Sequence, residues 1–185
     1  STKVYQTTLK KIFNLSMVNK YFFSFLIFHS FILSMETVKN LDIDKFMGKW
    51  YVISNIPNFI EDNATDAYDE YTLNSDGTIE IFYHALKDNN PVTMKQRAKV
   101  IDKENNSEWR LKLTSPCIPF LRFPYKVIIL DKKYEYMVVG YPKNKYGWIM
   151  SRNKKMDDDL YKEILTNLEL KFGYNIEQFK KVIHN

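Results

Sequence analysis

Eight short runs of β-branched and aromatic residues, separated at hairpin spacing by turn residues, constrain the fold of this chain most strongly. Runs of this length and spacing are typical of an all-β sandwich or barrel. In the clearest hairpin, Asp76-Gly77 separates two of the runs, and we expect this pair to supply the positive φ angles of a tight turn. The predicted strands span residues 49–56, 66–73, 78–85, 94–102, 108–114, 124–130, 134–141 and 146–151.

Helical signals flank the predicted strands on both sides. A short helical turn precedes the first strand, and either Asp42 or Asp44 can cap it. After the last strand, Asp157-Asp158-Asp159 can cap a longer helix that stops at Phe172-Gly173. Its apolar residues recur at helical spacing, so we expect the helix to pack outside the sheet, joined by apolar residues of the tail. The residues of this seam are Leu160, Ile164, Leu165, Leu168, Ile176, Phe179 and Val182.

Composition and charge limit the possible partners. The chain has 185 residues, of which 45% are apolar, and this is enough for one packed domain. The net charge is +5, but residues 1–40 carry five basic residues and one acid (+4), so the remaining 22 basic and 21 acidic residues give only +1. A nearly neutral body without a basic stripe argues against nucleic acid. The single cysteine, Cys117, excludes an intrachain disulfide.

We divide the chain into an N-terminal basic and apolar arm (1–40) and a β domain (41–185). In the arm, lysines precede the apolar run 21–33, which resembles the core of a signal peptide. As a helix this run would measure only about 20 Å, against roughly 30 Å of bilayer hydrocarbon. The alternative is an apolar helix at 10–35 that docks on the β domain or on another subunit, and the second version predicts a homo-oligomer.

Three separated motifs resemble those of the lipocalin family. Gly48-Lys49-Trp50-Tyr51 is similar to its Gly-x-Trp signature, residues 130–134 to its second motif, and Ser151-Arg152 to its third. With residues 138–142 and 146–152, the match is to the branch that contains bacterial outer-membrane lipocalin and apolipoprotein D. The resemblance implies an eight-stranded antiparallel up-and-down β-barrel that carries a small apolar ligand and performs no chemistry on it. It also implies a secreted or otherwise non-cytosolic protein (lumenal or vacuolar), here without a lipid anchor, that sequesters oxidised lipids.

The motif residues have physical roles that we expect to be architectural. Trp50 supplies a flat plug for one end of the barrel, and Arg152 can lie across its indole. Gly48 permits a close approach of the chains. Asp131 can accept N–H bonds in the turn that also contains Tyr134, although the same aspartate would suit an ordinary turn.

The interior of an eight-stranded barrel can hold one small ligand, so the inward-facing residues are the candidate binding site. Alternation from Trp50 predicts a mostly apolar and aromatic lining, suited to fatty acids, lysolipids, sterols or retinoid-like compounds. For the seventh strand, Tyr136 with Val138 and Met137 with Val139 are equally possible. The predicted ligand-binding residues are Val52, Ser54, Tyr71, Ile79, Ile81, Tyr83, Val100, Trp109, Leu111, Leu113, Val127, Ile129, Trp148 and Met150, with Phe59 as a gate in the loop after the first strand.

Other functions leave weaker signals. The three histidines lie in different elements without a catalytic partner, so we predict no enzyme and no cofactor or metal. Haem binding through His84 is one alternative, but alternation directs this side chain to solvent. Another is an oligomeric structural module whose barrel is plugged by aromatic side chains. The apolar segment 115–124 can anchor its own loop or touch the ligand, a membrane or a second subunit.

Overall fold

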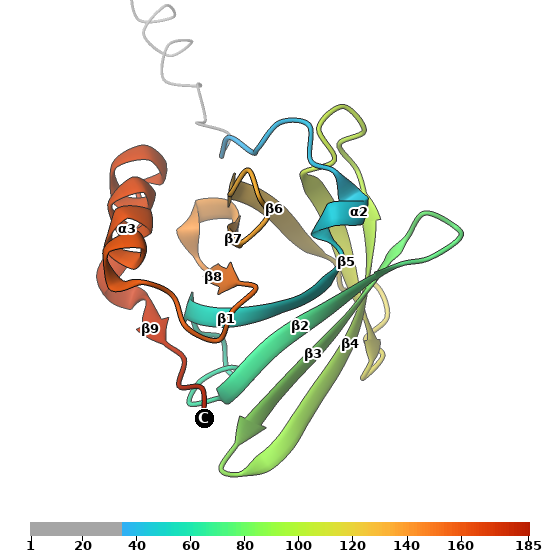
Figure 1. Cartoon of the computed structure of the whole chain (residues 1–185). Helices are drawn as coiled ribbons and strands as arrows, with labels where there is room; N and C mark the ends of the chain where they lie inside the picture. The colour runs from blue at the N-terminus through green and yellow to red at the C-terminus, as the bar shows by residue number, and fades with distance from the viewer. Residues whose placement is uncertain (1–34) are drawn as a thin grey trace, which may run out of the picture. The chain divides into compact units, whose positions relative to one another are not determined.

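The computed structural model describes residues 35–185, which form a closed antiparallel β-barrel of eight strands with a C-terminal helix outside it (Figure 1). The predicted fold class is therefore confirmed. The predicted arm helix and the apolar run 21–33 lie outside the described residues. The strands are β1 (Gly48–Ile56), β2 (Thr65–Leu73), β3 (Ile79–Lys87), β4 (Asn90–Val100), β5 (Glu108–Ser115), β6 (Phe123–Leu130), β7 (Tyr136–Gly140) and β8 (Gly147–Ser151). The remaining elements are α2 (Ile43–Phe46), the 3₁₀ turns η1 (Pro142–Asn144) and η2 (Ile176–Gln178), α3 (Asp158–Phe172) and the two-residue strand β9 (Lys180–Lys181).

The barrel follows an up-and-down order, because each strand from β1 to β8 pairs with the next one in the chain. It closes through β1, which bonds to β8 on one side and to β2 on the other. The β1–β2 pairing covers only Gly48–Tyr51 of β1. Further along, β9 pairs with Ser54 and Asn55 of β1. The alternation of the sequence did not reveal β9, because its two lysines are exposed and the strand is too short to show a pattern.

The turns and helix ends follow from local side-chain chemistry. In the β2–β3 hairpin only Gly77 has a positive φ, at 76°, so the expected left-handed pair reduces to one residue. Asp76 instead accepts bonds from the N–H and hydroxyl of Thr78. Asp42 caps α2, and Asp157 caps α3 by accepting the N–H groups of residues 159 and 160. Helix α3 ends at Gly173, whose φ of 70° places it in the left-handed region.

The sheet carries one apolar cluster on each of its two faces. One fills the barrel interior, and the other lies between α3 and the outer faces of β1, β6, β7 and β8. Of the predicted apolar face of the helix, Ile164 and Leu168 are buried in the outer cluster, and Leu160 and Leu165 are partly buried against it. Tyr161, which was not part of that prediction, is buried there as well. Of the three tail residues, Ile176 and Phe179 join this cluster. Val182 packs against the interior cluster instead, because the tail extends along β1 and bonds its N–H to the Ile53 carbonyl.

Two bulges change which residues face inward. An extra residue in β1 shifts the register between Val52 and Ser54, and another in β6 shifts it between Val127 and Ile129. Ser54, expected inside, therefore bonds to Tyr161 of α3, and Ile129, also expected inside, packs with the outer cluster.

Strand β7 resolves the open alternative between its two faces. Met137 and Val139 face the interior, whereas Tyr136 and Val138 face α3.

Among residues 35–185, no helix combines the length and apolarity needed to cross a membrane.

Candidate ligand-binding site

The base of the barrel is closed by Trp50 and Arg152. The guanidinium carbon lies 3.7 Å from the centre of the indole ring, which is a close cation–π arrangement. The guanidinium also donates hydrogen bonds to the backbone carbonyls of residues 45, 46, 49 and 134, at 2.8 to 3.3 Å. The indole N–H bonds to the Phe46 carbonyl at 2.8 Å. Arg152 thus ties α2, β1 and the β6–β7 turn together under the plug.

The neighbouring motif residues support this closure. Gly48 has a φ of 92°, and a Cβ atom there would lie 3.4 Å from the Arg152 guanidinium, so the position suits glycine. Asp131 accepts the N–H groups of Lys133 and Glu135, and thereby fixes the β6–β7 turn. The hydroxyl of Tyr134 accepts the N–H of Asp42 at 2.9 Å, which holds α2 on the base.

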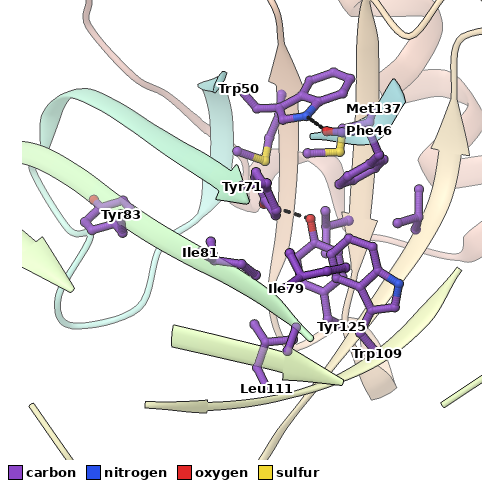
Figure 2. Packing of buried hydrophobic residues seen from close by; sticks show 14 of the residues in the cluster. Phe46, Trp50, Tyr71, Ile79, Ile81, Tyr83, Trp109, Leu111, Tyr125 and Met137 are labelled. Atoms are coloured by element: carbon purple, nitrogen blue, oxygen red, sulfur yellow. Dashed lines mark hydrogen bonds between the residues drawn. The ribbon is translucent and has the colours of Figure 1, made fainter. Parts of the chain in front are cut away.

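Aromatic side chains form a packed layer on the interior side of the plug (Figure 2, with Trp50 at the top). Phe46 contacts Trp50, Tyr71 and Trp109, with ring centres 5.1 to 5.5 Å apart. Trp109 stacks on Tyr125 at 4.8 Å. The hydroxyls of Tyr71 and Tyr125 are 2.8 Å apart and share a buried hydrogen bond. These rings fill the lower barrel, which places any guest nearer the open end.

Most of the predicted lining lies in the interior cluster, in the arrangement that alternation requires. Leu113 is also buried but lies in neither apolar cluster. Phe59, expected as a gate, is 85% exposed on the loop after β1. The predicted residues in the interior cluster are Val52, Tyr71, Ile79, Ile81, Tyr83, Val100, Trp109, Leu111, Val127, Trp148 and Met150.

Two acidic residues of the interior were missed at the sequence level. Glu61, in the loop after β1, accepts hydrogen bonds from the side-chain amides of Asn55 and Asn58 and from the indole N–H of Trp148. Its donors are all neutral, and burial raises the pKa of its carboxyl.

Asp69 is the second missed acid, and it stands opposite Tyr83 in the β2–β3 register. One of its oxygens accepts the Tyr71 hydroxyl at 3.3 Å, and the other is buried without a partner. Burial, with a smaller contribution from the negative charge of Glu61, raises the pKa of Asp69 to about 7. The available signal was its position two residues before Tyr71, since alternate strand residues share a face.

The open end carries exposed apolar side chains. The β5–β6 loop presents Phe120, 94% exposed, together with Ile118 and Leu121, and Phe59 protrudes from the β1–β2 loop. A surface pocket of about 320 Å³ lies under the β5–β6 loop, lined in part by Leu113 and Ile118. The segment 115–124 is thus largely exposed.

His84 lies on the outer face of β3, as alternation predicts. Its ring stacks on Tyr68 of β2 at 4.7 Å and meets Phe82 edge to face at 4.0 Å. It therefore cannot ligate a haem inside the barrel.

The family model of the lipocalin-like domain matches residues 41–184 of this chain. The chain belongs to the lipocalin family. It is similar to temperature-induced lipocalin-1 of Arabidopsis thaliana, with 31% identity over 80% of this chain and 81% of the relative. It is also similar to the outer membrane lipoprotein Blc of Escherichia coli K12, with 25% identity over 78% of this chain and 80% of that lipocalin.

The solved structures support the same fold. Insecticyanin from the tobacco hornworm Manduca sexta aligns with a TM-score of 0.61, at 15% identity, over 80% of this lipocalin and 84% of insecticyanin. Membership in the family supports the binding of small hydrophobic ligands in the barrel. Lipocalins are in general binding and transport proteins rather than enzymes.

Proposed function

We propose that this lipocalin carries a flat or chain-like hydrophobic molecule, of the fatty acid, lysolipid, sterol or retinoid-like type, in the upper part of its barrel. The observation that carries the proposal is a closed barrel whose inward side chains are almost all apolar or aromatic. Burial of a guest against such a lining contributes about 25 cal/mol per Å² of apolar surface. Shape complementarity then contributes more to affinity than hydrogen bonding does.

A blocked barrel tests the proposal. Ala85 is a small interior residue near the open end of β3, so Ala85→Trp places an indole in the space proposed for the guest. Thr93→Trp is the matched control, because Thr93 pairs with His84 and its exposed side chain lies on the outer face of β4 at the same level. We expect retinol to quench the tryptophan fluorescence of the wild type and of Thr93→Trp, and to bind Ala85→Trp at least about tenfold more weakly.

Equal binding by both variants would refute an interior site. Thermal unfolding of each variant checks that the barrel is intact, since overpacking costs about 1 to 3 kcal/mol. Ala85→Leu serves as the milder substitution if Ala85→Trp does not fold.

We also propose a peripheral membrane contact through the exposed apolar residues of the open end. Exposed phenylalanines on two separate loops of the open end suit shallow insertion at a lipid interface, where a guest could pass directly into the barrel. The double change Phe59→Ser with Phe120→Ser should reduce sedimentation with phosphatidylcholine vesicles several-fold. Leu73→Ser is the control, because Leu73 is an exposed residue of the closed end and its change should leave sedimentation unaltered. Unchanged sedimentation of the double variant would refute the membrane contact.

The remaining assignments concern location and biological role. We propose a secreted or lumenal protein that sequesters oxidised lipids and that forms a homo-oligomer through the apolar arm. Native mass spectrometry of the full chain tests the oligomer and the lipid binding, because it reports the mass of the assembly and of any lipid that remains bound. A monomer without lipid would contradict both proposals.

A further inference from the structure

The interior contains two carboxyl groups for which the fold provides no counter-ion. Neither Glu61 nor Asp69 forms an ion pair with any lysine, arginine or histidine in the described part of the chain. A buried carboxylate without a cationic partner is costly, so proteins usually pair it, protonate it or bind a cation to it. An apolar ligand alone would leave this cost in place.

The hydrogen bonds at Glu61 favour a fixed negative charge. Both of its oxygens act as acceptors, from Trp148 on one side and from Asn55 and Asn58 on the other. Three donors to the ionised form partly offset the desolvation of the carboxylate. The loop after β1 therefore holds an acceptor group at the open end of the barrel.

Unpartnered polar atoms also point into this region. Tyr83 is 98% buried in the interior cluster, and its hydroxyl has no hydrogen-bond partner among the described residues. Asp69, which faces Tyr83, has one buried carboxyl oxygen that also lacks a hydrogen-bond partner. Buried polar groups in native proteins are nearly always satisfied, so a free acceptor beside a free hydroxyl indicates the place of a ligand's polar head.

Resting on the proposed function, we propose that the polar end of the guest is a protonated amine, an alkylammonium with at least one N–H donor, held between Asp69 and Glu61 inside the barrel. Two carboxylates attract a cation and repel the head of a fatty acid. Trp148, which donates its indole N–H to Glu61, and Tyr83, which stands opposite Asp69, are side chains of the aromatic type that attracts alkylammonium groups. The ligand class is a cationic amphiphile, with an apolar tail or ring system and one amine.

Three probes of equal chain length separate this class from its rivals: dodecylammonium, dodecanol and dodecanoate. At pH 8 the carboxyl of Asp69, whose pKa is about 7, is mostly ionised, whereas burial raises the pKa values of Tyr71, Tyr83 and Tyr125 and keeps them neutral. With Glu61, these are the titratable groups that face Asp69. We expect isothermal titration of the full chain to show the ammonium bound at least about tenfold more tightly than the alcohol, and dodecanoate most weakly.

The isosteric changes Asp69→Asn and Glu61→Gln provide the decisive comparison. Each should reduce the affinity for dodecylammonium by about tenfold and leave that for dodecanol within about twofold. Glu70→Gln is the matched control, because it removes the adjacent acid from the exposed face of the same strand. It should change neither affinity.

Each outcome bears on a different claim. Equal binding of the ammonium and the alcohol, or an ammonium preference that survives both isosteric changes, would overturn the cationic head while leaving the hydrophobic carrier intact. Binding of none of the three probes would overturn the carrier function and this inference together.

Discussion

Replacing Arg152 with alanine removes a cation–π contact and four hydrogen bonds at the base of the barrel. The cation–π contact contributes about 0.5 to 2 kcal/mol. Each hydrogen bond contributes about 0.5 to 1.5 kcal/mol when buried, and we halve this sum because water can replace the guanidinium at the more exposed carbonyls. The free energy of unfolding should therefore fall by about 1.5 to 5 kcal/mol.

Urea unfolding at pH 7, followed by tryptophan fluorescence, measures this loss. Arg152→Lys should recover only a minor part, because an ammonium can neither bridge four carbonyls nor stack as a flat group on Trp50. Arg110→Ala is the control, since Arg110 is exposed on β5 and should cost no more than about 0.5 kcal/mol. If Arg152→Ala costs no more than this control, or if lysine restores the wild-type value, the closure of the base does not depend on the stacked guanidinium.

Two further predictions concern backbone geometry and buried charge. Gly48→Ala should cost about 1 to 2 kcal/mol more than an ordinary surface substitution, because φ is 92° and the new methyl group meets Arg152. Thermal unfolding measures this loss. Gly77→Ala is the control, because Gly77 also has a positive φ but has open space around it, so the comparison separates backbone strain from the contact with Arg152. Asp69 has a pKa of about 7 when folded and an ordinary value near 3.8, so folding favours its protonated form. The ionisation of Asp69 should therefore cost the unliganded protein up to about 4 kcal/mol as pH rises from about 4 to about 7, measured as the change in the stability of the wild type relative to Asp69→Asn, with Glu70→Gln as the control. A constant difference between the wild type and Asp69→Asn across this pH range would show that Asp69 ionises freely.

Sequence patterns predict the barrel well, because alternation indicates each strand and characteristic turn residues indicate the turns. The eight strands, the cap at Asp157 and the stop at Gly173 are all local signals. The bulges are different, since an extra residue is accommodated only against a particular partner strand. The inward placement of Ser54 and Ile129 failed for this reason.

The polar part of the candidate site was harder to predict. An acid in the middle of a strand suggests an outward side chain, and the burial of Asp69 depends on strands that close around it. Glu61 lies in a loop, where alternation has no meaning, and its orientation depends on Trp148 some 87 positions later. The two acidic groups of the interior could therefore not be predicted from composition or alternation.

The C-terminal tail has a consequence for association between molecules. Beyond Tyr51, β1 separates from β2, and its free backbone edge is occupied by β9 and by the bond from Val182 to Ile53. Loss of residues 180–185 would expose unpaired N–H and C=O groups along an apolar strand, which is a template for pairing with another chain. A shortened barrel would thus become prone to edge-to-edge aggregation, and it would also lose the packing of Val182 against the interior cluster.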